Sequence, residues 1–275
     1  MQRQSKTGSV IIQIALTILA FMMIVPFLWM ISSSLKENTQ VTKIPFEIIP
    51  KNIKWDNYVI IFQRAPMVRF ILNSFKVSII SILGLVLFNT MAAYTFAKLK
   101  FKGKDVIFLV FLGTMMIPSS VLLIPKYILF NYAGLIDSHL SLILPAFFSP
   151  FYMFMIRQYM MGIPDELLEA AKIDGSNQYS ILFRIVIPNI KPVLATVFIL
   201  SFIGNWNEFL NALVYLKSVT KYTIPIGIQF FNSSHVSMRA WSCAASLVAL
   251  TPLFAIFLFG QRYIMNSFVL SGLKG

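Results

Sequence analysis

The chain has 275 residues, of which 57% are hydrophobic, 15% are aromatic and only 12% are charged. Soluble domains carry about 25% charged residues, so this chain has too few to cover the surface of a soluble protein. Its aromatic content excludes an intrinsically disordered chain, because such chains are poor in aromatic residues. Together with a mean hydropathy of +0.76, the composition predicts an integral membrane protein.

The formal net charge is +13. Membrane proteins concentrate Lys and Arg in their cytoplasmic loops, and no basic stretch here is interleaved with base-stacking aromatic residues, so we expect no nucleic-acid partner. The single cysteine, Cys243, excludes an intramolecular disulfide bond. His139 and His235 are far apart in the sequence and have no metal-ligand spacing, so we expect no bound metal or cofactor.

Six apolar segments are long enough for helices that cross the ~30 Å hydrocarbon core, which takes about 20 residues. They are too long and too continuously apolar for the strands of a membrane barrel. The fold class is therefore an all-α membrane protein with six transmembrane helices. The predicted spans are Ser9–Ile31, Phe70–Ala97, Val106–Phe130, Leu140–Met160, Pro192–Leu213 and Trp241–Tyr263.

The first span resembles a secretory signal in its basic start, but it is longer than the ~7–15-residue core of such a signal and has no clear cleavage site. We interpret it as an uncleaved helix. An even number of spans places both termini on one side of the membrane. The short loop Lys98–Asp105 contains four lysines and the loop Asn131–His139 has no Lys or Arg, which predicts cytoplasmic termini.

These boundaries predict three regions. Residues 1–69 form the N-terminal span and an external loop. Residues 70–265 form a core of five spans that contains the cytoplasmic loop 162–191, and residues 266–275 form a cytoplasmic tail.

The sequence of the loop 162–191 predicts two short helices joined by a glycine turn. Pro164 suits a first helical turn, Gly175 suits a helix end, and Ser176 suits the N-cap of a second helix. Amphipathicity alone favours helices that lie on the lipid surface without a protein partner. The second helix has its apolar stripe at helical spacing, formed by Tyr179, Leu182, Phe183 and Val186.

The residues of this loop also form a long, specific string. It resembles the EAA motif of ABC importer permeases, EAA-x3-G-x9-I-x-L-P, with Ile187 in place of the usual leucine. The resemblance implies a coupling helix that docks in a cleft of a separate ATP-binding subunit. The residues that it implies for ATPase coupling are Glu169, Ala170, Ala171, Asp174, Gly175, Ile185 and Pro188.

Two further strings resemble the carbohydrate-uptake branch of these permeases, and its maltose-type second permease. Asn205–Leu210 is similar to the branch's WNEF signature, and 261–275 is similar to its QRY…GLxxGAxKG tail, here shortened. The resemblance runs from about Ile11 to Gly275. It implies a second permease subunit, two ATP-binding subunits and an extracytoplasmic solute-binding protein as partners, with Lys274 and Gly275 reaching towards the ATPase.

The fifth predicted span carries a cluster of polar and aromatic residues. A charge at the bilayer centre costs ~2.5–3.5 kcal/mol. Glu208 lies about 16 residues into the span, ~24 Å from its inner end, so we expect it in the outer part of the membrane, where this cost is lower. Two interpretations stay open: a sugar pathway, or polar contacts that hold the helices together. Lys76 and Lys126 lie near the predicted outer face, where lysine can extend to the interface. The substrate-pathway candidates are Asn205, Trp206, Asn207, Glu208 and Asn211.

The sequence contains no G-x-x-x-x-G-K-[ST] string, so we expect ATP and Mg²⁺ to be bound by a partner ATPase. It also has no catalytic dyad in its spans, which argues against an intramembrane enzyme. The main alternative is an ion-coupled secondary transporter, which would need an ion-binding acid near the midplane. The sequence therefore predicts a permease subunit that moves a sugar or sugar-like polyol across a bacterial or archaeal cytoplasmic membrane by alternating access.

Overall fold

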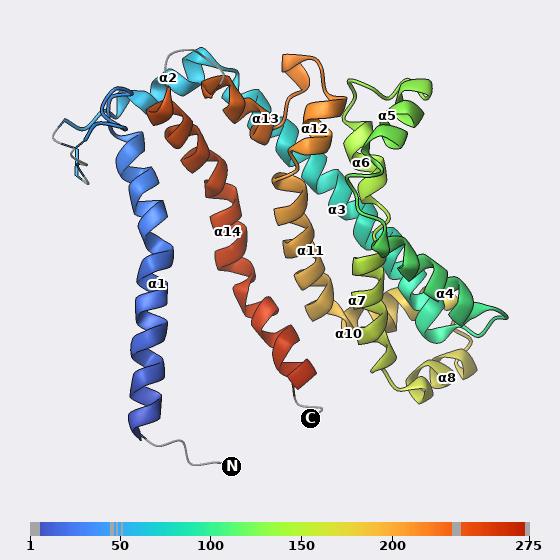
Figure 1. Ribbon diagram of the computed structural model, residues 1–275. Coiled ribbons are helices and arrows are strands. Elements are labelled where there is room, and N and C mark those ends of the chain that lie inside the picture. The colour runs from blue at the N-terminus through green and yellow to red at the C-terminus, as the bar shows by residue number, and fades with distance from the viewer. Residues whose placement is uncertain (1–5, 45–46, 48, 51, 233–237, 273–275) are drawn as a thin grey trace. The chain divides into compact units, whose positions relative to one another are not determined.

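The computed structural model describes residues 6–44, 47, 49–50, 52–232 and 238–272, and these residues form helices and turns with no strand (Figure 1). The chain divides into two compact units. The first comprises Met1–Met67 and Gly227–Thr251, and the second comprises Val68–Ile226 and Pro252–Gly275. The helix α14, Arg239–Gly272, contributes to both units.

The first unit contains α1, Lys6–Ser34, the short α2, Asp56–Arg64, and the start of α14. The side chains of α1 are exposed along most of the helix, including Phe21 and Met23. An apolar helix that is exposed on this scale lies against lipid or another subunit, because water would not solvate it.

Asn57 of α2 joins the three helices of this unit. It is 5% exposed. Its Nδ2 donates to the carbonyl oxygens of Ser34 at 2.7 Å and Lys36 at 2.8 Å, and its Oδ1 accepts from Trp241 Nε1 at 3.0 Å. The side chain thus satisfies the carbonyl group of Ser34, the last residue of α1, which has no partner within the helix, and that of Lys36 just after it.

The second unit holds most of the helices. They are α3 (Met67–Lys98), α4 (Lys104–Gly113), α5 (Leu123–Tyr132), α6 (Leu140–Ala146), α7 (Pro150–Met161), α8 (Asp165–Ile173), α9 (Gln178–Ile181), α10 (Ile187–Asn189), α11 (Lys191–Trp206), α12 (Leu210–Tyr215) and α13 (Ile224–Ile228). Short 3-10 turns cover Thr114–Met116 and Val219–Lys221, and a π-helix covers Leu182–Val186. The end of α13 and the 3-10 turn Gln229–Phe231 that follows it belong to the first unit.

Three of the predicted spans correspond to single helices that are long and apolar enough to cross a membrane: Ile12–Ser34, Met67–Lys98 and Arg239–Arg262. A fourth candidate span, Leu140–Met161, consists of α6 and α7 with a break at 147–149, so the prediction of one helix over Leu140–Met160 is wrong in this detail. Gln178–Asn189 and Lys191–Trp206 form a further candidate, bent by 79°. The chain is thus an all-α membrane protein. The helix α14 continues to Gly272, and 273–275, which include Lys274 and Gly275, lie outside the described residues.

The prediction of one continuous helix over Val106–Phe130 is wrong. The helix α4 ends at Gly113, and α5 begins only at Leu123. Pro118 explains the break, because proline disfavours helical dihedrals in the residue before it. Ile117 is accordingly extended, with φ −84° and ψ 115°.

The prediction of one helix over Pro192–Leu213 is also wrong. The helix α11 ends at Trp206, and α12 begins at Leu210. In the break between them, Glu208 Oε1 accepts a hydrogen bond from the Asn211 backbone N–H at 3.0 Å, so the carboxylate caps the start of α12. Glu208 therefore lies at a helix break rather than in the middle of a helix.

The core of the second unit packs α3, α7 and the segment 181–190 together. Met153, Ile156 and Met160 of α7 are fully buried, as are Ile181 and Val186. On α3, Asn89 donates to the Phe147 carbonyl oxygen at 2.8 Å and accepts from the Ser149 N–H at 3.2 Å. These two bonds give hydrogen-bond partners to backbone groups in the break between α6 and α7.

The contacts of Asn57 predict the effect of its removal. We expect Asn57→Ala to lower the free energy of unfolding by roughly 2–3 kcal/mol, because a buried polar group left without a partner costs about 1–3 kcal/mol. Thermal unfolding of the purified protein in detergent measures this loss. The exposed Asn52→Ala is the matched control, and an equal melting temperature for the two variants would contradict the role of Asn57.

Candidate functional site

A cavity of about 170 Å³ lies in the second unit, between α3, α5, α6, α11 and α12. Three of the five residues predicted for a substrate pathway line it, namely Asn205, Glu208 and Asn211. Apolar side chains contribute part of the remaining lining. The lining residues are Val77, Lys126, Ser141, Leu142, Pro145, Ala146, Asn205, Glu208, Asn211 and Tyr215.

The break between α11 and α12 positions the polar groups of this cavity. Asn205 is in the last turn of α11, and its Nδ2 donates to the Ser201 carbonyl oxygen at 2.8 Å. Glu208 uses one carboxylate oxygen to cap α12 through Asn211. The break thus directs three polar residues that are close in sequence, Asn205, Glu208 and Asn211, towards the same cavity.

The other two candidates lie elsewhere. Trp206 is 1% exposed and packs on the rings of Phe75 and Phe202, with centroid distances of 4.8 and 5.3 Å. Asn207 is exposed, and its Nδ2 donates to the Ile203 carbonyl oxygen at 2.9 Å. Neither residue lines the cavity, so the structure brings together only part of the predicted set.

Sequence reasoning did not assign three of the lining residues to this site: Lys126, Ser141 and Tyr215. Tyr215 follows Asn211 by one helical turn, and this spacing is a signal that sequence analysis can use. Lys126 was interpreted only as an interfacial lysine. Ser141 is distant in sequence from the other polar residues and carries no signal of its own.

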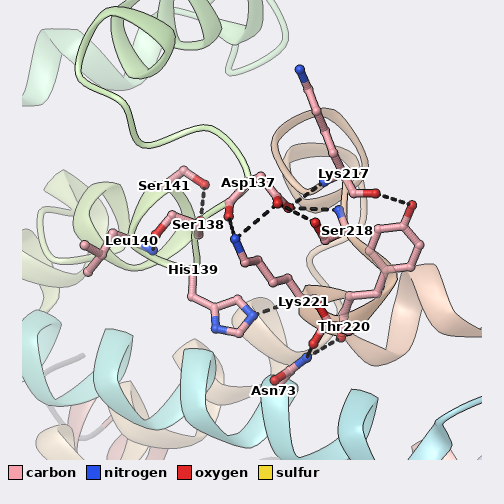
Figure 2. Close-up of polar contacts among 11 residues, drawn as sticks. Asn73, Asp137, Ser138, His139, Leu140, Ser141, Lys217, Ser218, Thr220 and Lys221 are labelled. Carbon is pink, nitrogen blue, oxygen red and sulfur yellow. Dashed lines mark hydrogen bonds and ion pairs between the residues drawn. The ribbon is translucent and has the colours of Figure 1, made fainter.

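A second polar cluster joins two loops near one end of this unit (Figure 2). Asp137, in the loop between α5 and α6, accepts from the backbone N–H groups of Lys217 and Ser218, both at 2.9 Å, and from the Ser218 hydroxyl at 2.5 Å. Lys221 Nζ lies 3.1 Å from its carboxylate. These bonds hold the pKa of Asp137 well below its usual range, with the Ser218 hydroxyl as the main cause.

The loop that binds Asp137 is also held from its other side. Asn73 of α3 donates to the carbonyl oxygens of Thr220 at 3.0 Å and Tyr222 at 2.9 Å. His139 Nε2 lies 2.9 Å from the Lys221 carbonyl oxygen. The segment 217–222, which follows α12, is therefore fixed both to the loop before α6 and to α3.

The lowered pKa of Asp137 predicts a pH-dependent contribution to stability. This contribution is present above the ordinary aspartate pKa of ~3.9 and is lost as the pH falls towards the lower pKa of the folded state. We expect Asp137→Asn to lower the melting temperature at pH 7, and the difference from the wild type to shrink progressively as the pH falls below about 4. Melting curves across this range measure it, and a difference that stays constant with pH would contradict the role of the carboxylate.

The loop 162–191 contains α8, a glycine turn and a second helical segment. The end of α8 is a Schellman motif: Ser176 N–H donates to the Ala171 carbonyl at 2.9 Å and Gly175 N–H to that of Lys172 at 3.0 Å. Gly175 has φ +82°, a conformation that favours glycine, and a Cβ placed there would meet no other described part of the chain within 4 Å.

Two details of the sequence prediction for this loop are wrong. Asn177, not Ser176, is the N-cap of the second segment, since its Oδ1 accepts from the Ser180 N–H at 2.8 Å. The second detail is the apolar stripe of the second segment, whose four residues do not share one buried face. Because 182–186 form a π-helix with wider spacing, Leu182 and Val186 are buried while Tyr179 and Phe183 are 67% and 50% exposed.

Contacts with the rest of the unit hold α8 in place. Lys98, at the end of α3, donates to Asp165 Oδ1 at 2.7 Å and to the Ile163 carbonyl oxygen at 2.5 Å. The hydrogen bond and charge of Lys98 lower the pKa of the exposed Asp165. Leu168 and Ala171 of α8 are buried.

The remaining residues of the predicted coupling set differ in their exposure to solvent. Glu169, Ala170, Asp174, Gly175 and Pro188 are exposed, and Ile185 is half-buried. Ile173, next to this set, is 87% exposed. The loop thus presents a small surface of mixed apolar and acidic residues, whose backbone is fixed by α3 and by the Schellman motif.

A search of the described residues finds no group of three His, Cys, Asp or Glu side chains that could hold a metal ion. His139 is engaged with the loop that follows α12, and His235 lies outside the described residues.

Comparison with known proteins adds three findings. Residues 86–268 match the model of a family described as binding-protein-dependent transport system inner membrane component. The chain is 33% identical over 277 residues to the arabinooligosaccharides transport system permease protein AraQ of Halalkalibacterium halodurans, covering 100% of this chain and 99% of AraQ.

Solved structures show the same fold. A chain from a bacterial ABC transporter involved in the import of the acidic polysaccharide alginate has a TM-score of 0.84 at 21% identity, covering 96% of this chain and 98% of that chain. A chain from a bacterial alginate ABC transporter in complex with an alginate pentasaccharide-bound periplasmic protein has a TM-score of 0.68 at 16% identity, covering 95% and 96%. At these identities the likeness establishes the fold alone.

Proposed function

We propose that this chain, which belongs to the family of binding-protein-dependent transport system inner membrane components, is a permease subunit of an ATP-driven ABC importer that moves a sugar or sugar-like polyol. It is a translocation component rather than an enzyme. The observation that carries the proposal is the exposed loop around Gly175, which has the EAA string and is fixed to the membrane helices. The sugar class rests on the similarity to AraQ.

In this proposal α8 docks on a separate ATPase subunit that binds ATP and Mg²⁺. The exposed Glu169, Ala170 and Ile173 offer a small surface for such a partner. Motion of α8 would reach α3 through the Lys98–Asp165 contact and α7 through the buried Leu168 and Ala171. A fixed connection of this kind is what transmission of nucleotide-driven closure requires, because packed elements move as units.

The proposal places the loop 162–191 and both termini in the cytoplasm. The lysine-rich loop Lys98–Asp105 supports this orientation, since short loops follow the positive-inside rule best. The exposed apolar surface of α1 supports contact with lipid or with a second permease subunit. The further partners proposed are two ATP-binding subunits and an extracytoplasmic solute-binding protein.

The alternative of an ion-coupled secondary transporter gains one feature from the structure, because Glu208 lies in a helix break. That carboxylate already caps α12. Membership of the binding-protein-dependent family favours ATP coupling over this alternative.

Gly175→Asp tests the coupling loop. We expect this variant to insert into the membrane and to lose uptake, because a side chain at φ +82° costs about 1–2 kcal/mol and projects into the proposed docking surface. Gly103→Asp is a matched control, since Gly103 has φ +79° in another loop and, among the described residues, a Cβ there meets only Ile107, at 3.9 Å. Uptake of a radiolabelled sugar by whole cells that contain the complete importer is the measurement. Equal uptake by the two variants would contradict the coupling role.

Purification of the tagged chain from its native membrane tests the assembly. We expect a P-loop ATPase and a second multi-span permease to co-purify, identified by mass spectrometry, and Gly175→Asp to reduce the amount of ATPase. Recovery of the chain alone, under conditions that keep other membrane complexes intact, would overturn the proposal.

A further inference from the structure

The short helix α2 lies at the level where a membrane span ends. It is bonded to the last turn of α1, because Tyr58 Oη lies 2.9 Å from Ser34 Oγ (Figure 1). The helix α2 ends at Arg64, and the long apolar helix α3 begins at Met67. With 9 residues, α2 is about 14 Å long and too short to cross the ~30 Å hydrocarbon core. It therefore lies at a surface of the membrane.

One face of α2 packs against the rest of the first unit. Asn57 and Ile61 of this face are 5% and 0% exposed. Asn57 is bonded to the end of α1 and to Trp241 at the start of α14. The guanidinium group of Arg64 lies 5.1 Å from the centre of the Trp241 ring. These contacts hold α2 at one rotation about its axis, so the directions of its other faces are fixed.

A second face of α2 is apolar and exposed. Trp55, Val59 and Phe62 are 66%, 57% and 41% exposed. Trp55 precedes α2 but has helical dihedrals, with φ −62° and ψ −26°. At about 100° per residue, the three side chains fall within about 60° of one another. They therefore form one stripe along the helix, and we call it the α2 stripe. A grouped set of this kind marks a contact surface, whereas scattered apolar residues do not.

A third face of α2 is polar and exposed. Asp56 and Gln63 are both exposed, and they lie about 90° around the helix from the middle of the α2 stripe. A helix on the surface of a soluble protein needs two faces, one for protein and one for water. A helix at a membrane surface needs a third face for lipid. The arrangement of side chains on α2 meets this second requirement.

The position of the hydrocarbon layer along α1 agrees with lipid as the partner of the α2 stripe. Apolar side chains of α1 are exposed as far as Ile31, which is 44% exposed. Ser34, which contacts α2, follows three residues later, about 4.5 Å further along the axis. The apolar face of an interfacial helix enters the boundary of headgroups and acyl chains by about 5–10 Å, and tryptophan is enriched there. The α2 stripe, with Trp55, is thus within reach of this boundary.

We propose that α2 is an interfacial anchor, whose stripe of Trp55, Val59 and Phe62 inserts into the lipid leaflet at the end of α1. Asp56 and Gln63 stay in water. Because Asn57 bonds α2 to both α1 and α14, the anchor sets the depth of these two helices in the bilayer. This lipid contact does not depend on the coupling loop or on an ATPase.

Spin labels on α2 test the anchor. The chain has one cysteine, Cys243, so Cys243→Ala provides a cysteine-free background. Nitroxide labels are attached to Val59→Cys and Phe62→Cys, with Asp56→Cys and Gln63→Cys as matched controls on the same helix. The purified chain, with all subunits that co-purify and without a solute-binding protein, is placed in nanodiscs of phosphatidylethanolamine and phosphatidylglycerol. Collisions with oxygen, which dissolves in lipid, and with a water-soluble nickel chelate are measured for each label.

We expect the ratio of oxygen to nickel collisions to be several-fold higher at 59 and 62 than at 56 and 63. Equal ratios would place the α2 stripe in water, as a docking site for a soluble protein requires, and would overturn the proposal. Labels at 59 and 62 that neither reagent reaches would mean that another subunit covers the stripe, and this result overturns it as well. A missing ATPase subunit in the preparation bears on the proposed function alone.

Tryptophan fluorescence gives a second test that introduces no cysteine. The emission lost in Trp55→Phe reports on Trp55 alone among the four tryptophans. We expect lipids brominated near the headgroup to quench this emission more than lipids brominated at the end of the acyl chain. Trp206→Phe is the control, since Trp206 is 1% exposed and its emission is expected to be quenched less. Emission from Trp55 that neither lipid quenches contradicts the anchor.

Discussion

The structure depends on one constraint: a backbone group inside a membrane must find its hydrogen-bond partner within the protein. Unbroken helices meet this constraint by themselves, as α1 and α3 do. Each break needs another solution, and side chains supply it. Asn89 of α3 serves the carbonyl and N–H groups between α6 and α7, and Glu208 serves the start of α12. Asn89 and Glu208 thus each serve a place where a helix stops.

The same breaks create the candidate site. A continuous α11 would carry Glu208 and Asn211 onward along a helix, whereas the break lets α12 start in a new direction and turns both residues into the cavity with Asn205. Lys126 and Tyr215 complete a lining with opposite charges and a buried hydroxyl. The loop 162–191 follows a different principle. Its helix α8 is short and has little burial, and it depends on α3, through Lys98, for its position.

Sequence reasoning succeeded where the signal is local. Hydropathy located the membrane segments, and glycine chemistry placed the turn at Gly175, which the structure has at φ +82°. It failed where hydropathy averages over a break. The segment Val106–Phe130 is apolar throughout, yet Pro118 interrupts it. It also failed at 182–186, because a π-helix changes which side chains share a face and no periodicity rule for α-helices anticipates it.

The sequence by itself determined that this chain lies in a membrane as helices, and it contained the string that marks an importer permease. Both conclusions depend on residues close together along the chain. Only the tertiary structure decided that Lys126, Ser141 and Tyr215 share a cavity with Glu208, while Trp206 of the same signature is buried against Phe75 and Phe202. The reason is physical: the direction in which each side chain points after a helix break depends on packing between helices that are distant in sequence.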